Sequence, residues 1–167
     1  MSTYRLPILG HATNPDPGDT VHWEPYTINA TNYVWAPLVA IFPDDSTRTG
    51  LHGVFGVPQN YNTNASFVIV WTSTAVANDV EWDIDYRAVG GNDTESLDQA
   101  GNDESLNGND TVPGAVNRRL EFDISATSGN FAAGDTVEFA IFRDGTDAGD
   151  GMAADAMLFE LFFEYDD

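Results

Sequence analysis

Hydrophobic and polar residues alternate along much of this chain with a period of two. The clearest stretch is DVEWDIDYRAV, where the apolar positions are Val80, Trp82, Ile84 and Tyr86. The same alternation recurs at 119–124 and 137–141. A period of two predicts antiparallel strands that turn one face to a core and the other to water. No stretch of useful length shows the 3.6-residue period of a helix.

Two further runs are apolar on more than one face. SFVIVWT, residues 66–72, predicts a strand that is buried on both sides. In AMLFELFFEY, residues 156–165, one predicted face consists of Met157, Phe159, Leu161, Phe163 and Tyr165. The other face alternates apolar and acidic residues. We therefore expect this strand to lie centrally in a sheet, or to turn its second face to another chain.

Short strands separated by turns rich in Gly, Asn and Asp predict an all-β protein. Long connections between about eight strands favour a jelly-roll-like antiparallel β-sandwich, with an immunoglobulin-like sandwich as the alternative. We expect one domain over 1–167, because no internal boundary is visible. The stretch 90–111 is predicted to be its one long acidic loop.

The charge of the chain is strongly one-sided. It has 27 acidic residues against six basic ones, all arginine, and a formal net charge of −21. Such a surface repels phosphates and anionic lipids, which excludes nucleic acid and membrane surfaces as expected partners. Cysteine is absent, so the chain has neither disulfides nor thiolate metal sites. No apolar run approaches the length of a membrane span.

Two acidic stretches were considered as calcium sites. Gly-Asn-Asp occurs at 91, 101 and 108, but the unequal spacing prevents the stacked ligands of a tandem calcium repeat, and a solvated loop is the expectation. In RDGTDAGDG the carboxylates of Asp144, Asp147 and Asp150 follow at i, i+3 and i+6. They could converge on a hard cation such as calcium, the one cofactor considered. The alternative is a tight turn between strands.

Catalytic machinery is not visible. His11, His22 and His52 stand alone, and no nucleophile motif occurs, so we expect no enzyme activity. Trp71 and Trp82 fall in phase with core positions. Trp23, Tyr26 and Tyr61 lie beside proline or polar turn residues and are the predicted contacts of a glycan.

Residues 66–165 resemble a group of proteins through several motifs. These are the strand end WTST, the strand DVEWDIDYRA, the hairpin AAGDTVEFAIFRDGTDA and the terminal LFELFFEY. They are similar to small β-sandwich virion proteins of tailed bacteriophages. That resemblance implies trimers that decorate heads or sit at tail or fibre tips, with residues 1–25 as an attachment segment.

The resemblance therefore predicts a non-enzymatic capsid decoration (cement) protein, made in the host cytoplasm and placed on the virion exterior. Its expected partners are its own copies, as a homotrimer, and the major capsid protein or a tail protein. The alternative is a receptor- or carbohydrate-binding module at a tail or fibre tip.

Overall fold

A computed structural model describes residues 1–14, 16, 18–26, 36–90, 96–98 and 101–167. Its elements are β1 Thr3–Pro7, η1 Leu9–His11, β2 His22–Pro25, β3 Leu38–Phe42, β4 Arg48–Gly56, β5 Thr63–Ser73, β6 Asp79–Val89, β7 Glu104–Thr111, β8 Leu120–Ser125, η2 Ser128–Asn130, β9 Thr136–Asp144 and β10 Ala156–Asp166. The helices η1 and η2 are single 3-10 turns. No helix in the described ranges is long and apolar enough to cross a membrane.

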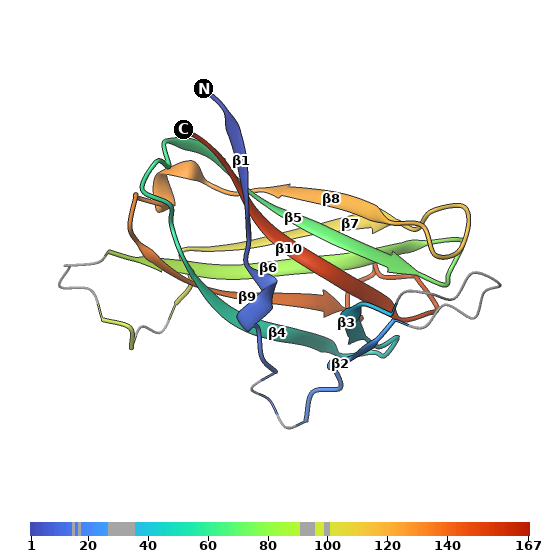
Figure 1. The fold of residues 1–167 in the computed structure, drawn as a ribbon. Coiled ribbons are helices and arrows are strands. Elements are labelled where there is room, and N and C mark those ends of the chain that lie inside the picture. Colours follow the sequence, from blue (N-terminus) through green and yellow to red (C-terminus); the bar gives the residue numbers. More distant parts are fainter. Residues whose placement is uncertain (15, 17, 27–35, 91–95, 99–100) are drawn as a thin grey trace.

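The strands form two antiparallel sheets packed face to face (Figure 1). Sheet A has the order β2-β3-β10-β5-β8, with β1 also paired to β10, and sheet B has the order β4-β9-β6-β7. This arrangement confirms the predicted all-β sandwich with jelly-roll-like topology. The described residues contain ten strands instead of about eight.

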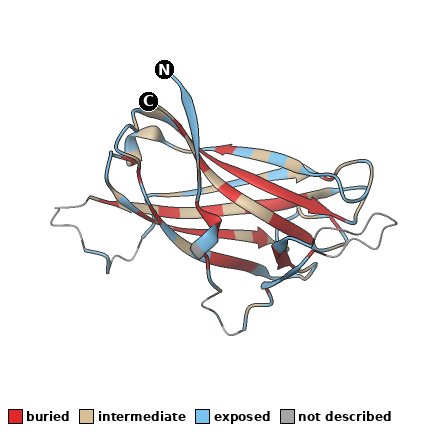
Figure 2. Ribbon diagram, viewed as in Figure 1, coloured by how far each residue is buried: buried red, intermediate tan, exposed pale blue. Residues whose placement is uncertain are grey.

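The main core lies between the two sheets. Trp71 of β5 and Trp82 of β6 are fully buried there, and their rings meet edge to face with centroids 5.9 Å apart. Figure 2 shows β5 almost wholly buried, whereas β7 and β8 alternate between exposed and partly buried positions. The core positions predicted for both tryptophans are confirmed, because alternation along antiparallel strands fixes the face of each side chain.

Strand β10 is central, as predicted, with β5 on one side and β1 and β3 on the other. Its facing pattern differs from the prediction because the pairing with β5 shifts between Leu158 and Glu160. A bulge of this kind adds one residue and reverses the phase of the residues after it. Leu158 and Leu161 therefore both face the main core, while Phe159 packs with a second cluster on the outer side.

The predicted loop 90–111 is partly a strand. Residues 91–95 and 99–100 lie outside the described residues, but Glu104–Thr111 is β7, paired to β6 along its length. Of its four inward positions only Leu106 is a large apolar residue, which hides the strand in the sequence. Gly108 lies under the ring of Phe122, and Asp110 accepts a hydrogen bond from Trp71 Nε1 at 2.9 Å.

The segment 1–25, predicted to attach the protein elsewhere, contributes to sheet A. β1 pairs with the last five residues of β10, which places the two chain ends side by side (Figure 1). Ile8, just before η1, and Leu9, its first residue, are 3% and 2% exposed, and β2 extends the sheet beyond β3. Residues 15 and 17 are outside the description. The described parts of the segment are therefore built into sheet A, and a role in attachment stays a prediction.

Candidate functional site

A groove of about 330 Å³ lies on the outer face of sheet B. Its lining residues are His52, Asp85, Tyr86, Arg87, Gly101, Asn102, Glu138, Phe139, Ala140 and Phe142. The strand register explains the hollow. Ala140 of β9 pairs with His52 of β4 on one side and with Asp85 of β6 on the other, so a small residue lies between two larger ones. Neighbouring strands are only about 4.8 Å apart, so the methyl group of Ala140 forms the floor.

Phe142 supplies the aromatic surface of the groove. It pairs with Gly50, where a Cβ atom would lie only 2.3 Å from Phe142 Cδ1, so a glycine is needed for the ring to lie over β4. The His52 ring meets it edge to face at 5.7 Å. The guanidinium carbon of Arg48 lies 3.6 Å from the ring centroid, close enough for a cation–π contact.

The carboxylates beside this ring are held by arginine. Arg48 donates from Nε to Asp83 at 2.7 Å and from Nη2 to Asp85 at 2.9 Å. These two side chains are only 15% and 19% exposed, so the ion pairs with Arg48 are partly shielded from water. Burial raises the pKa of Asp83, although the bond from Arg48 opposes the shift.

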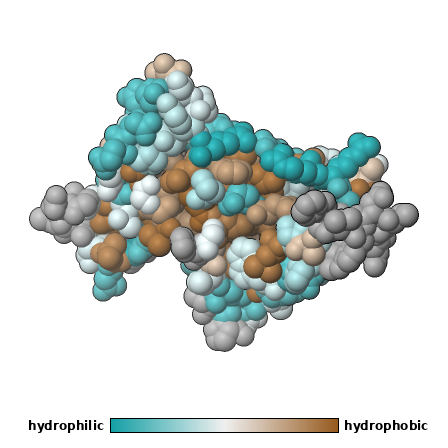
Figure 3. Space-filling view, viewed as in Figure 1, coloured by the Kyte–Doolittle hydropathy of each residue, from teal (hydrophilic) through white to brown (hydrophobic). Residues whose placement is uncertain are grey.

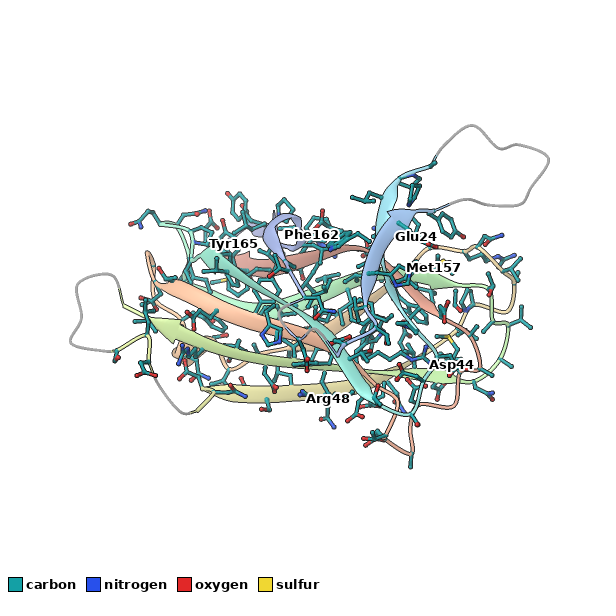
Figure 4. The ribbon with its side chains drawn as sticks, turned by 90° about the horizontal axis from the view of Figure 1, so that it is seen from below. Glu24, Asp44, Arg48, Met157, Phe162 and Tyr165 are labelled. Carbon is teal, nitrogen blue, oxygen red and sulfur yellow. The ribbon has the colours of Figure 1, made fainter. Side chains whose placement is uncertain are left out.

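At the next rung of the sheet, Arg87 and Glu138 form an ion pair of 2.5 Å. The groove thus contains two carboxylates, those of Asp85 and Glu138, that are each held in place by an arginine. Figure 4 shows Arg48 on the opposite side of the sandwich from Phe162 of β10, so this site is separate from the outer face of sheet A.

The structure does not bring the three predicted glycan contacts onto one platform. Trp23, on β2, is 36% exposed, but Tyr26 is only 8% exposed. Tyr26 packs edge to face on Phe159 at 5.3 Å and donates its hydroxyl hydrogen to Asn117 Oδ1 at 2.5 Å. Tyr26 therefore fills the second apolar cluster, and its predicted contact with a glycan stays a prediction.

Tyr61 also serves the interior. It is half-buried among Phe131, Phe163 and Tyr165, and its hydroxyl donates to the carbonyl of Ser128 at 2.8 Å. Tyr26 therefore lies near the beginning of β10 and Tyr61 near its end, and burial raises the pKa of both tyrosines.

The predicted calcium ligands point to different partners. Asp144 Oδ1 accepts from Thr146, and Asp147 Oδ1 accepts from the backbone of Gly149 at 2.7 Å. Asp150 faces inward and binds Arg143 through both oxygens. Within the described part of the chain, no three or more His, Asp or Glu side chains are grouped as metal ligands. Calcium at Asp144, Asp147 and Asp150 stays a prediction.

Sequence reasoning missed the groove residues His52 and Phe142. One local signal was available, because Phe142 falls out of phase with the core residues Val137, Phe139 and Ile141. An aromatic residue on the wet face of a strand is a candidate contact surface. The pairing of β4 with β9, which brings His52 to this ring, has no local signature in the sequence.

No protein-family model and no curated protein matches this chain. Among solved structures, the arabinose-bound MgGH51 α-L-arabinofuranosidase is similar with a TM-score of 0.52 at 12% identity, covering 94% of this chain. The chain spans only 23% of the length of that enzyme. A family 35 carbohydrate-binding module from Clostridium thermocellum is similar with a TM-score of 0.48 at 10% identity, and the similarity covers 100% of each chain. CsCBM6-3 from Clostridium stercorarium, in complex with cellobiose, has a TM-score of 0.46 at 8% identity. That similarity covers 96% of this chain and 92% of CsCBM6-3. At these identities the likeness is one of fold.

Proposed function

We propose that this chain is a non-catalytic carbohydrate-binding module that holds a short saccharide in the groove of sheet B. The observation that carries the proposal is the set of fixed polar side chains around the ring of Phe142. A saccharide offers hydroxyl groups that both donate and accept hydrogen bonds, together with faces of C–H groups that pack on aromatic rings. The groove offers counterparts to both kinds of surface.

The polar partners lie on both sides of the floor. Asp85 and Glu138 have carboxylate oxygens that accept hydrogen bonds, while His52 and Asn102 supply a ring nitrogen and an amide. Their ion pairs hold the carboxylates in place before a ligand arrives, which lowers the entropy lost on binding. A volume of about 330 Å³ is within the usual range of ligand sites.

The charges favour a neutral saccharide. The groove carboxylates are already paired with Arg48 and Arg87, so the site has no arginine in reserve for an anionic sugar. The net charge of −21 repels acidic polysaccharides over longer distances. We therefore expect binding to neutral glycans and not to uronic acid polymers.

The same ion pairs argue against hydrolysis. A glycoside hydrolase needs one protonated carboxyl group to donate a proton to the leaving oxygen. In this groove Asp85 and Glu138 each already accept a hydrogen bond from an arginine, Arg48 and Arg87 respectively. Binding without turnover is the activity that this arrangement supports.

The test is isothermal titration calorimetry with arabinose, cellobiose, xylan and, as an anionic probe, polygalacturonate. We expect binding to a neutral saccharide, weakened about tenfold or more in Phe142→Ala and His52→Ala. Trp23→Ala, on β2, is the matched control and should bind as the parent does. Loss in Trp23→Ala alone would move the site to β2, and the absence of binding to every saccharide would overturn the proposal.

A second candidate is the virion structural protein expected from the resemblance, and one observation favours it. Apolar side chains gather over the middle of the face that carries β10 (Figure 3). Phe159 and Phe162 are half-buried and point outward there. An apolar face of this kind suits contact with further copies of the chain. Light scattering tests it: a trimer that Phe162→Ser converts to a monomer would support this function, and a monomeric parent would oppose it.

A further inference from the structure

Glu81 is an acidic residue of β6 that is almost closed off from solvent. It lies on β6 beside Asn109 of β7 and is only 5% exposed. Its backbone N–H donates to Asp150 Oδ2 at 3.3 Å, but among the described residues none donates to its carboxylate oxygens. A carboxylate that is largely withdrawn from water and has oxygens free to accept is a candidate ligand for a cation.

The loop that joins β9 to β10 forms a small cradle at this carboxylate. The position that a Cβ atom would take at Gly149 lies 2.8 Å from Glu81 Oε2, 3.1 Å from the side-chain amide of Asn109 and 3.2 Å from Asp147 Oδ1. Three polar groups from β6, β7 and the loop thus converge beside Gly149, where a larger side chain would stand among them. The amide oxygen and nitrogen of asparagine exchange places by a simple flip, so Asn109 can also face the cradle with its oxygen.

The nearby positive charges are already engaged. Arg143 binds Asp150, and Arg48 binds Asp83 on the neighbouring rung of β6. Asp147 and Asp144 each satisfy one oxygen with their own turn, and no ion pair is formed by either in the described structure. Burial, together with the charges of Asp147, Asp83, Asp144 and Asp150, raises the pKa of Glu81 to about 7.

We propose that Glu81, Asp147 and Asn109 bind a divalent cation of the calcium class at the Gly149 cradle. Two carboxylates and one amide oxygen are hard ligands, and the remaining positions would be filled by water, as is common at calcium sites. Calcium tolerates the irregular geometry of a loop better than magnesium, which requires a near-ideal octahedron. The site shares Asp147 with the sequence prediction but takes Glu81 in place of Asp150, and it does not depend on the saccharide groove.

The decisive variant fills the cradle without changing any charge. In Gly149→Ala the new methyl group would stand 2.8 Å from Glu81 Oε2. Gly151→Ala, in the same loop, is the matched control, because its Cβ would meet nothing closer than 3.6 Å. Calcium binding to the full chain is measured by calorimetry, and thermal unfolding is followed in calcium chloride and in sodium chloride of equal ionic strength, because any salt screens the acidic surface.

We expect calcium to raise the unfolding temperature of the parent and of Gly151→Ala, with a dissociation constant on the order of 10⁻⁴–10⁻³ M. Gly149→Ala should bind at least about tenfold more weakly, a loss of about 1.4 kcal/mol. Glu81→Gln, which keeps the shape of the side chain, should lose the calcium-dependent rise. No calorimetric binding to the parent at about 10 mM calcium, well above that range, would overturn the proposal. An equal calcium-dependent rise in Glu81→Gln and the parent would do the same.

Discussion

Arg143 and Asp150 form a bidentate ion pair that is closed off from solvent. The Nε–Oδ2 distance is 2.8 Å and the Nη2–Oδ1 distance 2.9 Å, with side chains that are 1% and 3% exposed. The guanidinium group also donates to the carbonyls of Met152 at 2.7 Å and Ala154 at 2.8 Å. One arginine of β9 therefore holds the loop that leads to β10.

Asp150→Asn should destabilise the fold strongly, because it leaves the charge of Arg143 buried without its main counter-ion. Removing one partner of a buried pair costs about 3–5 kcal/mol. Urea unfolding followed by tryptophan fluorescence measures this loss. Arg119→Gln is the control, since its pair with Glu121 is on the surface, with an arginine side chain that is 59% exposed. Its cost should be under about 1 kcal/mol, and equal costs for the two variants would contradict the argument.

Gly50→Ala should disturb both the fold and the groove. The added methyl group would lie 2.3 Å from Phe142 Cδ1 and 2.6 Å from the carbonyl oxygen of Ile141, so the ring must leave β4. Overpacking of this kind costs about 1–3 kcal/mol. Gly56→Ala on the same strand is the matched control, because its nearest contact would be 3.9 Å away. We expect lower stability and weaker saccharide binding in Gly50→Ala alone, and unchanged stability would show that the ring is not confined by Gly50.

Removal of residues 1–7 should destabilise the protein, because β1 is part of sheet A. Strand β1 pairs with β10, Arg5 binds Glu164 at 2.6 Å, and Tyr4 stacks on Tyr165 with centroids 5.5 Å apart. Without β1 this side of β10 loses its ladder partner and becomes an open edge. Thermal unfolding of the truncated chain should occur at a lower temperature. An unchanged transition would show that residues 1–7 do not contribute to the stability of the sandwich.

The sandwich could be predicted from the sequence because a strand with one buried face alternates apolar and polar residues with a period of two. That signal located Trp71 and Trp82 in the core and β10 in the centre of its sheet. It failed at β7, where only Leu106 of the four inward positions is a large apolar residue, and at the bulge of β10, where one extra residue reverses the pattern.

The groove and the cradle were harder to predict because their parts come from different strands. His52 and Asp85 meet across Ala140 only through the pairing of β4, β9 and β6. Glu81 has the sequence context of an ordinary wet-face residue, and only the return of the loop at Gly149 buries it. Pairing between distant segments is set by the whole fold and leaves no local pattern to interpret.

Glu81 should make the stability of the protein depend on pH in a direction opposite to that of an ordinary surface carboxylate. Its pKa of about 7 in the folded state lies above the value of 4.5 for an unfolded chain, so the folded protein binds this proton more tightly. The stabilisation is fully present below about pH 4.5 and is lost as the pH rises through about 7. A shift of this size corresponds to about 3 kcal/mol.

Glu81→Gln isolates that effect, because glutamine resembles the protonated acid at every pH. In the presence of a chelator, the variant and the parent should have similar free energies of unfolding near pH 4.5, and the variant should be more stable by about 3 kcal/mol at pH 8. Glu24→Gln on β2, whose side chain is 55% exposed, should follow the parent throughout. Urea unfolding between pH 4.5 and 8 provides the measurement. If the free energies of unfolding of Glu81→Gln and the parent changed in parallel with pH, the carboxylate would be solvated or paired in the folded protein. If the two differed at pH 8 and the difference disappeared on addition of calcium, the same carboxylate would be a ligand of the cation site.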